Sequence, residues 1–373
     1  MEPEISQNSE IPAMFRKLQL RDITIPNRVG MSPLCMYQSK EGHANDFHVV
    51  HLGSRAVGGF GLVFAEMAAV SPEGRISTRD AGLWLDSHIA PWKRVVDFVH
   101  QRSSSAIAIQ LGHAGRKADT GVRWLRGTPE GQEGAGGFRT IAPSAIPFVE
   151  RYKIPTAIPE DDVPALVQKY VDAAKRVDQA GFDLVELHFA HGYLISSFLS
   201  PLSNKRNDSL GGSLEARMEL PLRIYRSVRE VWPESKPIAS RISAIDWEEG
   251  GNTIEDAVEI AKIFQNAGLD ILDISSGMVT HGGRPESEPK LFQVPFSAKI
   301  REAANIPTMT VGGVQDADAM NQIIGNGQAD ICLMGRAALY NPYFVRHAAR
   351  NLNYNLQWPD EYISADNVEV PIP

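Results

Sequence analysis

Two histidines and a tyrosine stand close together in the segment His188-Phe-Ala-His-Gly-Tyr193. They directly follow the apolar run Phe182–Leu187, which has the composition of a buried strand. Two imidazoles three residues apart on a strand-to-loop turn can donate to one oxygen and stabilise negative charge that develops there during a reaction. Tyr193 can supply a proton. The segment therefore predicts a site that polarises a substrate oxygen and delivers a proton.

Two other interpretations of this segment stay open on the residues alone. In the first, one histidine caps the turn and Tyr193 only packs. In the second, His188, His191 and Glu186 bind zinc, although Glu186 alternates with His188 along the same strand and nothing else completes a ligand set.

Glycines follow the last two of the apolar runs, in Thr308-Met-Thr-Val-Gly-Gly313 and Asp330-Ile-Cys-Leu-Met-Gly-Arg336. Barrels commonly bind phosphate after strands seven and eight, through backbone N–H groups and a short helix N-terminus. Arg336 adds a fixed positive charge and a fork suited to phosphate. Either glycine loop alone could simply form a tight turn. Together they predict a phosphate site made by Gly312, Gly313, Gly335 and Arg336.

Arg241 and Gln110 stand at the ends of two further apolar strands. An arginine inside such a strand is costly unless an anion or a ring carbonyl meets it. A phosphate-bearing heterocycle at the barrel mouth satisfies both residues together with the glycine loops. A flavin, whose pyrimidine side becomes anionic on reduction, fits this set. For Arg241 alone, a salt bridge to Asp183, Asp270 or another buried acid is the alternative.

The segment Ser32-Pro-Leu-Cys-Met-Tyr37 follows the first apolar run. Inert packing is the usual fate of a cysteine in a reducing compartment, and it is one interpretation of Cys35. The neighbours of Cys35 place it at the barrel mouth, where a thiol can touch the cofactor and shift its redox balance.

Short apolar, β-branched runs alternate with amphipathic stretches over most of the chain, as in parallel sheets with crossover helices. Eight runs are strand candidates: Arg28–Ser32, Gly61–Ala65, Ala106–Leu111, Asp183–His188, Pro237–Ile242, Asp270–Ile274, Thr308–Val311 and Asp330–Met334. Among the helix candidates are Asp161–Ala180, Glu215–Val231, Thr253–Ala267 and Asp316–Ile324. Eight units favour a single (β/α)8 TIM barrel over an open doubly wound sheet with extra strands.

Two long insertions interrupt this alternation. Ala69–His88 is a polar connection after the second strand, and Gly112–Glu160, with the glycine-rich run Gly127–Gly137, follows the third. A barrel places such excursions at its C-terminal face, where they wall the active site. The barrel is expected to span residues 13–357, with a disordered leader at 1–12 and a C-terminal tail at 358–373 that is disordered or lies on a neighbouring subunit.

The 373 residues are 43% hydrophobic and 22% charged, as in an ordinary globular enzyme. The net charge of -8 argues against a nucleic-acid or anionic-membrane binder, because such proteins need a basic surface. Neither a run of ~18 apolar residues nor the pattern of a secretory signal occurs. Cys35 and Cys332 form neither a disulfide framework nor an iron–sulfur ligand set. A cytoplasmic protein is therefore expected.

Taken together, these segments resemble the old yellow enzyme family of FMN-dependent ene-reductases, from about Phe15 to Asn353. The motifs that carry the resemblance are Asn27-Arg-Val-Gly-Met-Ser-Pro33, Gln110-Leu-Gly-His-Ala-Gly-Arg-Lys117, Ala142-Pro-Ser144, and His188-Phe-Ala-His-Gly-Tyr-Leu-Ile-Ser-Ser-Phe-Leu-Ser-Pro201 continuing through Asn204, Arg206, Asp208 and Gly211-Gly212. Cys35-Met-Tyr37 is similar to the thermophilic-like subgroup, which includes bacterial ene-reductases and xenobiotic reductases.

The resemblance implies a non-covalent FMN in contact with Ser32, Pro33, Leu34, Cys35, Met67, Gln110, Arg241, Gly335 and Arg336, with Gly312 and Gly313 helping to hold the phosphate. NADPH or NADH would reduce the flavin and leave. Flavin N5 would then deliver hydride to the β-carbon of an activated alkene (an enone, enal, maleimide or nitroalkene), and Tyr193 would protonate the α-carbon. His188 and His191 would bind the alkene's carbonyl or nitro oxygen, Cys35 would modulate the flavin's potential, and Tyr37 would contact the substrate.

Three positions depart from the family pattern. Met67 stands where relatives usually carry a small residue, and Leu210 replaces an aromatic residue before the paired glycines. The resemblance implies a homo-oligomer, a dimer or a tetramer. However, Tyr362-Ile-Ser364 offers no counterpart of the arginine that reaches the neighbouring active site in some relatives.

The alternative from another class is a flavin-free, phosphate-binding barrel lyase or isomerase. Such enzymes share the glycine loops but typically need a Schiff-base lysine or a carboxylate pair at the strand ends. The strand ends here carry His, Gln, Arg and Cys instead. A non-catalytic binding protein is disfavoured because so many polar groups converge on one barrel face.

Overall fold

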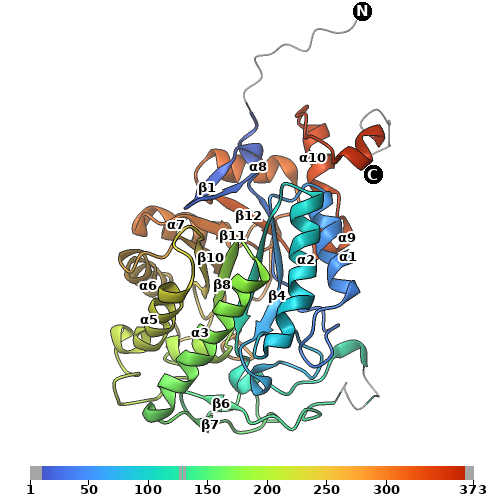
Figure 1. The fold of residues 1–373 in the computed structure, drawn as a ribbon. Helices are drawn as coiled ribbons and strands as arrows, with labels where there is room; N and C mark the ends of the chain where they lie inside the picture. Colours follow the sequence, from blue (N-terminus) through green and yellow to red (C-terminus); the bar gives the residue numbers. More distant parts are fainter. Residues whose placement is uncertain (1–10, 126–127, 129–131, 366–373) are drawn as a thin grey trace, which may run out of the picture.

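The structure, a computed structural model, describes residues 11–125, 128 and 132–365. Eight parallel strands close into a barrel in the order β10-β11-β12-β3-β4-β5-β8-β9 (Figure 1). In chain order they are β3 (Val29–Met31), β4 (Leu62–Ala69), β5 (Ala106–Gly112), β8 (Leu184–Phe189), β9 (Ile238–Ser243), β10 (Ile271–Ser275), β11 (Thr308–Thr310) and β12 (Ile331–Met334). Each overlaps one of the eight predicted strands, so the predicted TIM barrel is confirmed.

Helices surround the barrel (Figure 1). They are α1 (Asp46–Val57), α2 (Ile89–Arg102), α3 (Val163–Ala180), α4 (Leu194–Leu199), α5 (Leu214–Val231), α6 (Ile254–Asn266), α7 (Val294–Ala304), α8 (Ala317–Gly325), α9 (Arg336–Tyr340) and α10 (Phe344–Asn351). The four predicted helices agree with α3, α5, α6 and α8 to within two residues at each end. Ser213, Thr253 and Asp316 start three of them, because each side-chain oxygen accepts a backbone N–H of the first turn.

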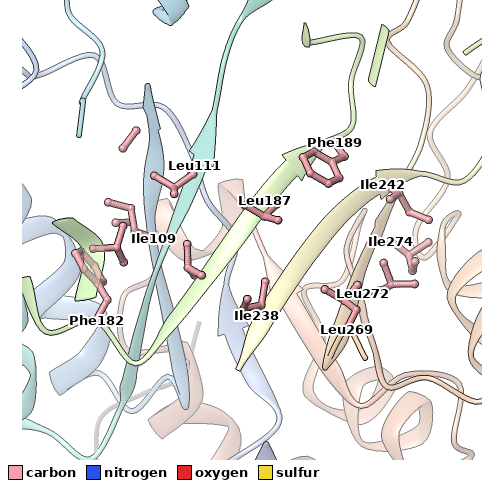
Figure 2. Packing of buried hydrophobic residues seen from close by; sticks show 14 of the residues in the cluster. Ile109, Leu111, Phe182, Leu187, Phe189, Ile238, Ile242, Leu269, Leu272 and Ile274 are labelled. Atoms are coloured by element: carbon pink, nitrogen blue, oxygen red, sulfur yellow. The ribbon is translucent and has the colours of Figure 1, made fainter. Parts of the chain in front are cut away.

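Alternation of side chains along the strands separates two apolar regions. Outward-facing residues such as Leu111, Leu187 and Ile274 pack beneath the helices in one continuous core, and Figure 2 shows part of it. Inward-facing residues of the barrel strands form a second, inner cluster of Leu62, Phe64, Ala106, Ala108, Leu184, Ala239, Ile271, Met309, Ile331 and Leu333.

A short hairpin closes the N-terminal end of the barrel. It consists of β1 (Leu18–Leu20) and β2 (Ile23–Ile25), and its residues Leu20 and Ile25 join the inner cluster. The hairpin was not among the predicted elements. Figure 1 shows it at the top, opposite the two-stranded sheet of β6 (Ile141–Ala142) and β7 (Thr156–Ala157) at the bottom.

Both predicted insertions lie at the C-terminal side of the strands. The first is polar in sequence but largely buried, and its segment around Asp80–Leu83 bridges to Gly42 and Ala69. Buried Asp80 orders the loop by accepting the backbone N–H groups of Ile76 and Ser77. The second insertion contains β6 and β7, and residues 127 and 129–131 of its glycine-rich run lie outside the described residues.

The ends of the chain are described in part. Of the predicted leader, only residues 11 and 12 are described, and of the predicted tail, residues 358–365. This part of the tail contacts its own barrel, through Trp358 stacked with Arg346 and an ion pair between Glu361 and Arg102. In the described part of the chain, every helix is too short or too polar to cross a membrane.

Candidate active site

A cavity of about 450 Å³ opens at the C-terminal ends of the barrel strands. This volume falls in the range of sites that hold small molecules and cofactors. The predicted residues that line it are Ser32, Pro33, Leu34, Cys35, Tyr37, Met67, Gln110, His188, His191, Tyr193, Arg241, Gly312, Gly335 and Arg336. Gly313 is the predicted residue that does not line it, and a Cβ at this position would stand 2.9 Å from Lys290 Cα.

His188, His191 and Tyr193 meet at the end of β8. The ring centroid of His188 lies 5.2 Å from that of His191 and 5.0 Å from that of Tyr193. His191 adopts φ +62°, and Gly192 follows at φ +70°. A Cβ at Gly192 would stand 2.3 Å from the carbonyl oxygen of Met278, so this turn requires glycine.

Lys117 fixes the turn from the neighbouring insertion. Its Nζ donates to the carbonyl oxygens of His191 at 2.7 Å and Met278 at 3.2 Å. The ammonium also lies over the ring of Tyr193, 4.9 Å from its centroid. Burial, with Arg116 and Arg284 nearby, lowers the pKa of Lys117 to about 7. Lys117 therefore ties the left-handed residue of the turn to the loop after β10.

Both histidines are held neutral. Burial, followed by the charge of Arg241, moves the pKa of His188 and of His191 well below the usual 6.5. The backbone N–H of Ala190 donates to His188 Nδ1 at 3.3 Å. A neutral ring that accepts at Nδ1 carries its proton on Nε2. His188 therefore presents an N–H donor to the cavity.

A chain of hydroxyl and amide groups orients His191. Its Nε2 lies 2.7 Å from Ser275 Oγ. Gln293 Nε2 donates to the Val311 carbonyl at 2.8 Å, and Ser276 Oγ donates to Gln293 Oε1 at 2.7 Å. Ser275 Oγ also lies 3.4 Å from Gln293 Oε1, but Ser276 donates to that oxygen at shorter range and the contact of Ser275 with His191 is shorter too. The Ser275 hydroxyl can therefore donate to His191 Nε2. The proton of His191 then resides on Nδ1.

The phenol and thiol in the cavity are neutral as well. Burial is the main reason that the pKa values of Tyr193 and Cys35 lie well above 10.0 and 9.0, and the carboxylate of Asp80 adds to both shifts. Tyr193 is thus a protonated phenol beside two neutral imidazoles. Met67 packs in this corner with Cys35 and Tyr193, and its sulfur blocks the space that a Cβ at Gly112 would need.

Polar side chains form the floor of the cavity. Gln110 and Arg241 face it, and Arg241 Nη2 donates to Ser32 Oγ at 3.1 Å. The buried acid that meets Arg241 is Asp273, at 3.0 Å from Nε. Arg241 thus meets a buried acid, as the alternative from the sequence expected, but this acid is neither Asp183 nor Asp270, the two that were named. Asp183 pairs with His100 and Asp270 with Arg21.

Glu186 does not join the histidines. Its Oε1 accepts from Gln110 Nε2 at 2.7 Å beneath the floor. Across residues 11–125, 128 and 132–365, His, Cys, Asp and Glu side chains do not gather in a group of three or more that could hold a metal ion. The zinc interpretation therefore lacks its third ligand.

The far end of the cavity is open and carries the ion pair of Arg336 and Glu288. Gly312 adopts φ +105°, and a Cβ there would clash with Gln293 and Phe292. At Gly335 a Cβ would meet only Leu34 at 3.8 Å. The side chain of Arg336 is 92% exposed and lies 3.8 Å from Glu288. A cavity with amide and guanidinium donors on its floor and an accessible arginine at one end fits a heterocycle that carries a phosphate.

Sequence reasoning missed one wall of the cavity. Ser275, Ser276, Met278, Glu288, Phe292, Gln293 and Val311 also line it. Most come from the end of β10 and the loop that follows. In the sequence, Ser275-Ser-Gly277 directly follows an apolar strand, as the predicted site residues do. This pattern could have identified the missed wall.

An eight-stranded parallel barrel with a cofactor-sized cavity at its C-terminal face defines a TIM-barrel enzyme. Residues 13–355 match the sequence profile of the NADH:flavin oxidoreductase / NADH oxidase family, and the chain belongs to this family. The chain is 41% identical, over 94% of its length and 96% of the relative's, to an NADPH dehydrogenase of Bacillus cytotoxicus.

Many solved structures share the fold, and two of them show the range of similarity. Morphinone reductase in complex with tetrahydroNAD superposes with a TM-score of 0.75 at 28% identity, covering 94% of each chain. A 2-naphthoyl-CoA reductase complex superposes with a TM-score of 0.83 at 23% identity. The match covers 91% of this chain but 52% of that one, so the chain spans about half the length of that reductase.

The family match decides between the two predicted classes. The chain is an oxidoreductase of the old yellow enzyme (NADH:flavin oxidoreductase) family, as the motifs predicted, and the flavin-free lyase or isomerase is set aside. The thermophilic-like subgroup stays a prediction.

Proposed function

We propose that this protein is an FMN-dependent ene-reductase, which uses NADPH or NADH to reduce an activated alkene such as an enone, enal, maleimide or nitroalkene. One observation carries the proposal. Neutral His188 and His191 meet the neutral phenol of Tyr193 at one end of a cavity whose other end holds Arg336. Such a site can bind a substrate oxygen by hydrogen bonds and protonate a substrate carbon, while a bound cofactor lies next to the substrate.

A bound flavin supplies the hydride chemistry, taking a hydride from the nicotinamide and passing one to the β-carbon of the alkene. The protein's own residues do the rest. His188 Nε2–H and His191 Nδ1–H donate to the substrate oxygen, where negative charge grows as the β-carbon gains hydride. Tyr193 donates its phenol proton to the α-carbon. Gln110 and Arg241 would hold the pyrimidine side of the flavin, and Gly312, Gly335 and Arg336 its phosphate.

The first test is whether the protein binds flavin and passes electrons to an alkene. We expect the purified protein to be yellow and to release FMN on denaturation. Anaerobic NADPH should bleach the colour, and a maleimide or nitroalkene should restore it. A preparation that stays colourless after addition of FMN would contradict the proposal.

The phosphate site is tested by comparing FMN with riboflavin, which lacks the phosphate. Replacing Arg336 with alanine is expected to weaken FMN binding by about 10- to 100-fold, because a charge-assisted hydrogen bond contributes roughly 1.5–3 kcal/mol. Riboflavin affinity should hardly change. Flavin fluorescence quenching on binding measures both Kd values, and Arg94→Ala, an exposed arginine of α2, is the control. Equal losses for the two flavins would argue against Arg336 as a phosphate ligand.

A further inference from the structure

A cluster of four buried polar side chains, two of which form the cavity floor, lies on the apolar inner cluster of the barrel. Its members are Gln110 on β5, Glu186 on β8, Arg241 on β9 and Asp273 on β10. On these strands the residue two positions earlier is apolar and belongs to the inner cluster, as with Ala108 before Gln110. The four side chains therefore form one polar layer on an apolar base.

Strand register brings the two carboxyl groups together. Gln110 pairs with Glu186 across β5 and β8, and Arg241 pairs with Asp273 across β9 and β10. Glu186 is opposite Ala239 on the intervening strand β9, whose short side chain leaves room above it. The carboxyl groups of Glu186 and Asp273 accordingly come within hydrogen-bonding contact of each other, and neither residue is exposed at all.

The contacts leave oxygen atoms without donors if both acids are ionised. Glu186 Oε1 accepts from Gln110 at 2.7 Å, while Glu186 Oε2 and both oxygens of Asp273 lack a hydrogen-bond donor. Arg241 Nε lies 3.0 Å from Asp273 Oδ2, but without the alignment of a hydrogen bond. Two carboxylates and one guanidinium would also place a net charge of about -1 in the barrel interior, which is costly there.

A single proton on Glu186 supplies the missing hydrogen-bond donor and removes the net negative charge. A protonated Glu186 donates its O–H to Asp273, so the facing oxygens become a donor and an acceptor. The charge of Asp273 then balances the charge of Arg241, and the cluster is neutral.

We propose that Glu186 is a carboxylic acid in the working enzyme, hydrogen-bonded to Asp273, and that its proton makes it a positioning residue for the flavin by keeping the net charge of the cluster, Arg241 included, at zero. The role towards the flavin rests on the proposed function. The pyrimidine side of the flavin becomes negative on reduction, and a cluster with a net negative charge beneath the flavin would oppose that change. A neutral cluster does not.

The acid–base environment supports this arrangement. Burial and then the charge of Asp273 raise the pKa of Glu186 well above 4.5, against the opposing effects of Arg241 and Gln110. Burial raises the pKa of Asp273 to about 6, lowered in part by Arg241 and by the hydrogen bond from Glu186. These groups face Glu186 from β5, β9 and β10, and His188, the next inward residue on β8, is neutral. The pair shares one proton, which stays on Glu186.

The proton itself is tested in the flavin-free protein. Burial raises the pKa of Asp80 to about 7, so the spectra are compared at a pH well above that value, where Asp80 is ionised. There the infrared spectrum of the wild type should show the C=O band of a buried carboxylic acid, and Glu186→Gln should lack it. Asp273→Asn should lack it too, because Glu186 then becomes the counter-ion of Arg241 and ionises. A wild-type spectrum without the band, or a band that persists in Glu186→Gln, would overturn the proposal.

Thermal unfolding across pH gives a second measurement on the same flavin-free proteins. The folded chain keeps a proton on Glu186 that the unfolded chain loses as pH rises past about 4.5. The wild type should therefore lose stability relative to Glu186→Gln as pH rises from about 4.5. A difference in Tm that does not vary with pH would contradict a raised pKa.

The role towards the flavin is tested by the reduction potential of the bound cofactor. Glu186→Gln exchanges one neutral group for another, so its midpoint potential should equal that of the wild type. The double variant Glu186→Gln/Asp273→Asn leaves Arg241 without a counter-ion and should have a more positive potential. A potential in Glu186→Gln that is clearly more positive than that of the wild type would mean that Glu186 is ionised. If the protein bound no flavin, the proposed function would fail while the flavin-free measurements would still decide the state of Glu186.

Discussion

Replacing Tyr193 with phenylalanine is expected to slow the oxidation of the bound flavin by an enone by about 10²- to 10⁴-fold, the usual contribution of a general acid. Reduction by NADPH should be nearly unchanged, because that half-reaction needs no proton from the protein. The phenol is well placed, since its ring lies 5.0 Å from His188, which holds the oxygen of the same substrate. Stopped-flow measurement of the two half-reactions separates them.

The control for this variant is Tyr37→Phe, which removes a second phenol that lines the same cavity. We expect a smaller loss from it, because the resemblance implies contact with the substrate and no proton transfer. Since burial raises the pKa of Tyr193 well above 10.0, the wild-type rate should not fall with its ionisation below pH about 10. Equal losses in both half-reactions of Tyr193→Phe would argue against a proton donor.

The barrel could be predicted from the sequence because its strands are buried on both faces and therefore appear as continuous apolar runs. The predicted run Asp270–Ile274 shows the limit of this signal, because it contains the charged residue Asp273 and still forms a strand. The hairpin of β1 and β2 was missed because Gln19 and Thr24 interrupt its strands, so neither strand appears as a continuous apolar run. Strands this short carry no measurable alternation. Packing of Leu20 and Ile25 inside the barrel stabilises the hairpin, and the sequence does not show that contact.

The residues of the site were predictable where polar side chains directly follow strands. The ion-pair partner of Arg241 was harder to predict. Asp183 and Asp270 precede their strands, at the N-terminal end of the barrel. There they accept the backbone N–H groups of Ile107 and Ile238. Asp273 lies in register with Arg241 in the middle of β10, and only the pairing of the strands reveals it.

The two histidines are expected to carry most of the binding of phenols, which imitate the polarised oxygen of an enone. Replacing His188 with alanine should weaken phenol binding by about 10- to 100-fold, because a hydrogen bond to a charged oxygen contributes roughly 1.5–3 kcal/mol. Turnover with enones should fall by about 10²- to 10³-fold, the usual effect of removing one donor to a developing oxyanion. His191→Ala should behave similarly, since its Nδ1–H serves the same oxygen.

The predicted binding of phenols assumes that His188 and His191 are neutral, with one N–H of each ring donating to the phenol oxygen. Burial and Arg241 keep the pKa of both histidines well below 6.5, so phenol affinity of the wild type should not change with histidine protonation near pH 6.5. Titration of the phenol into holoenzyme, followed by its charge-transfer absorption with the flavin, measures the Kd. His281→Ala is the matched control, because His281 lies beside Phe148 and outside the lining of the site. If both His188→Ala and His191→Ala bound phenols as tightly as His281→Ala, neither imidazole would be the oxygen ligand, and the site would have to polarise its substrate through Tyr193 alone.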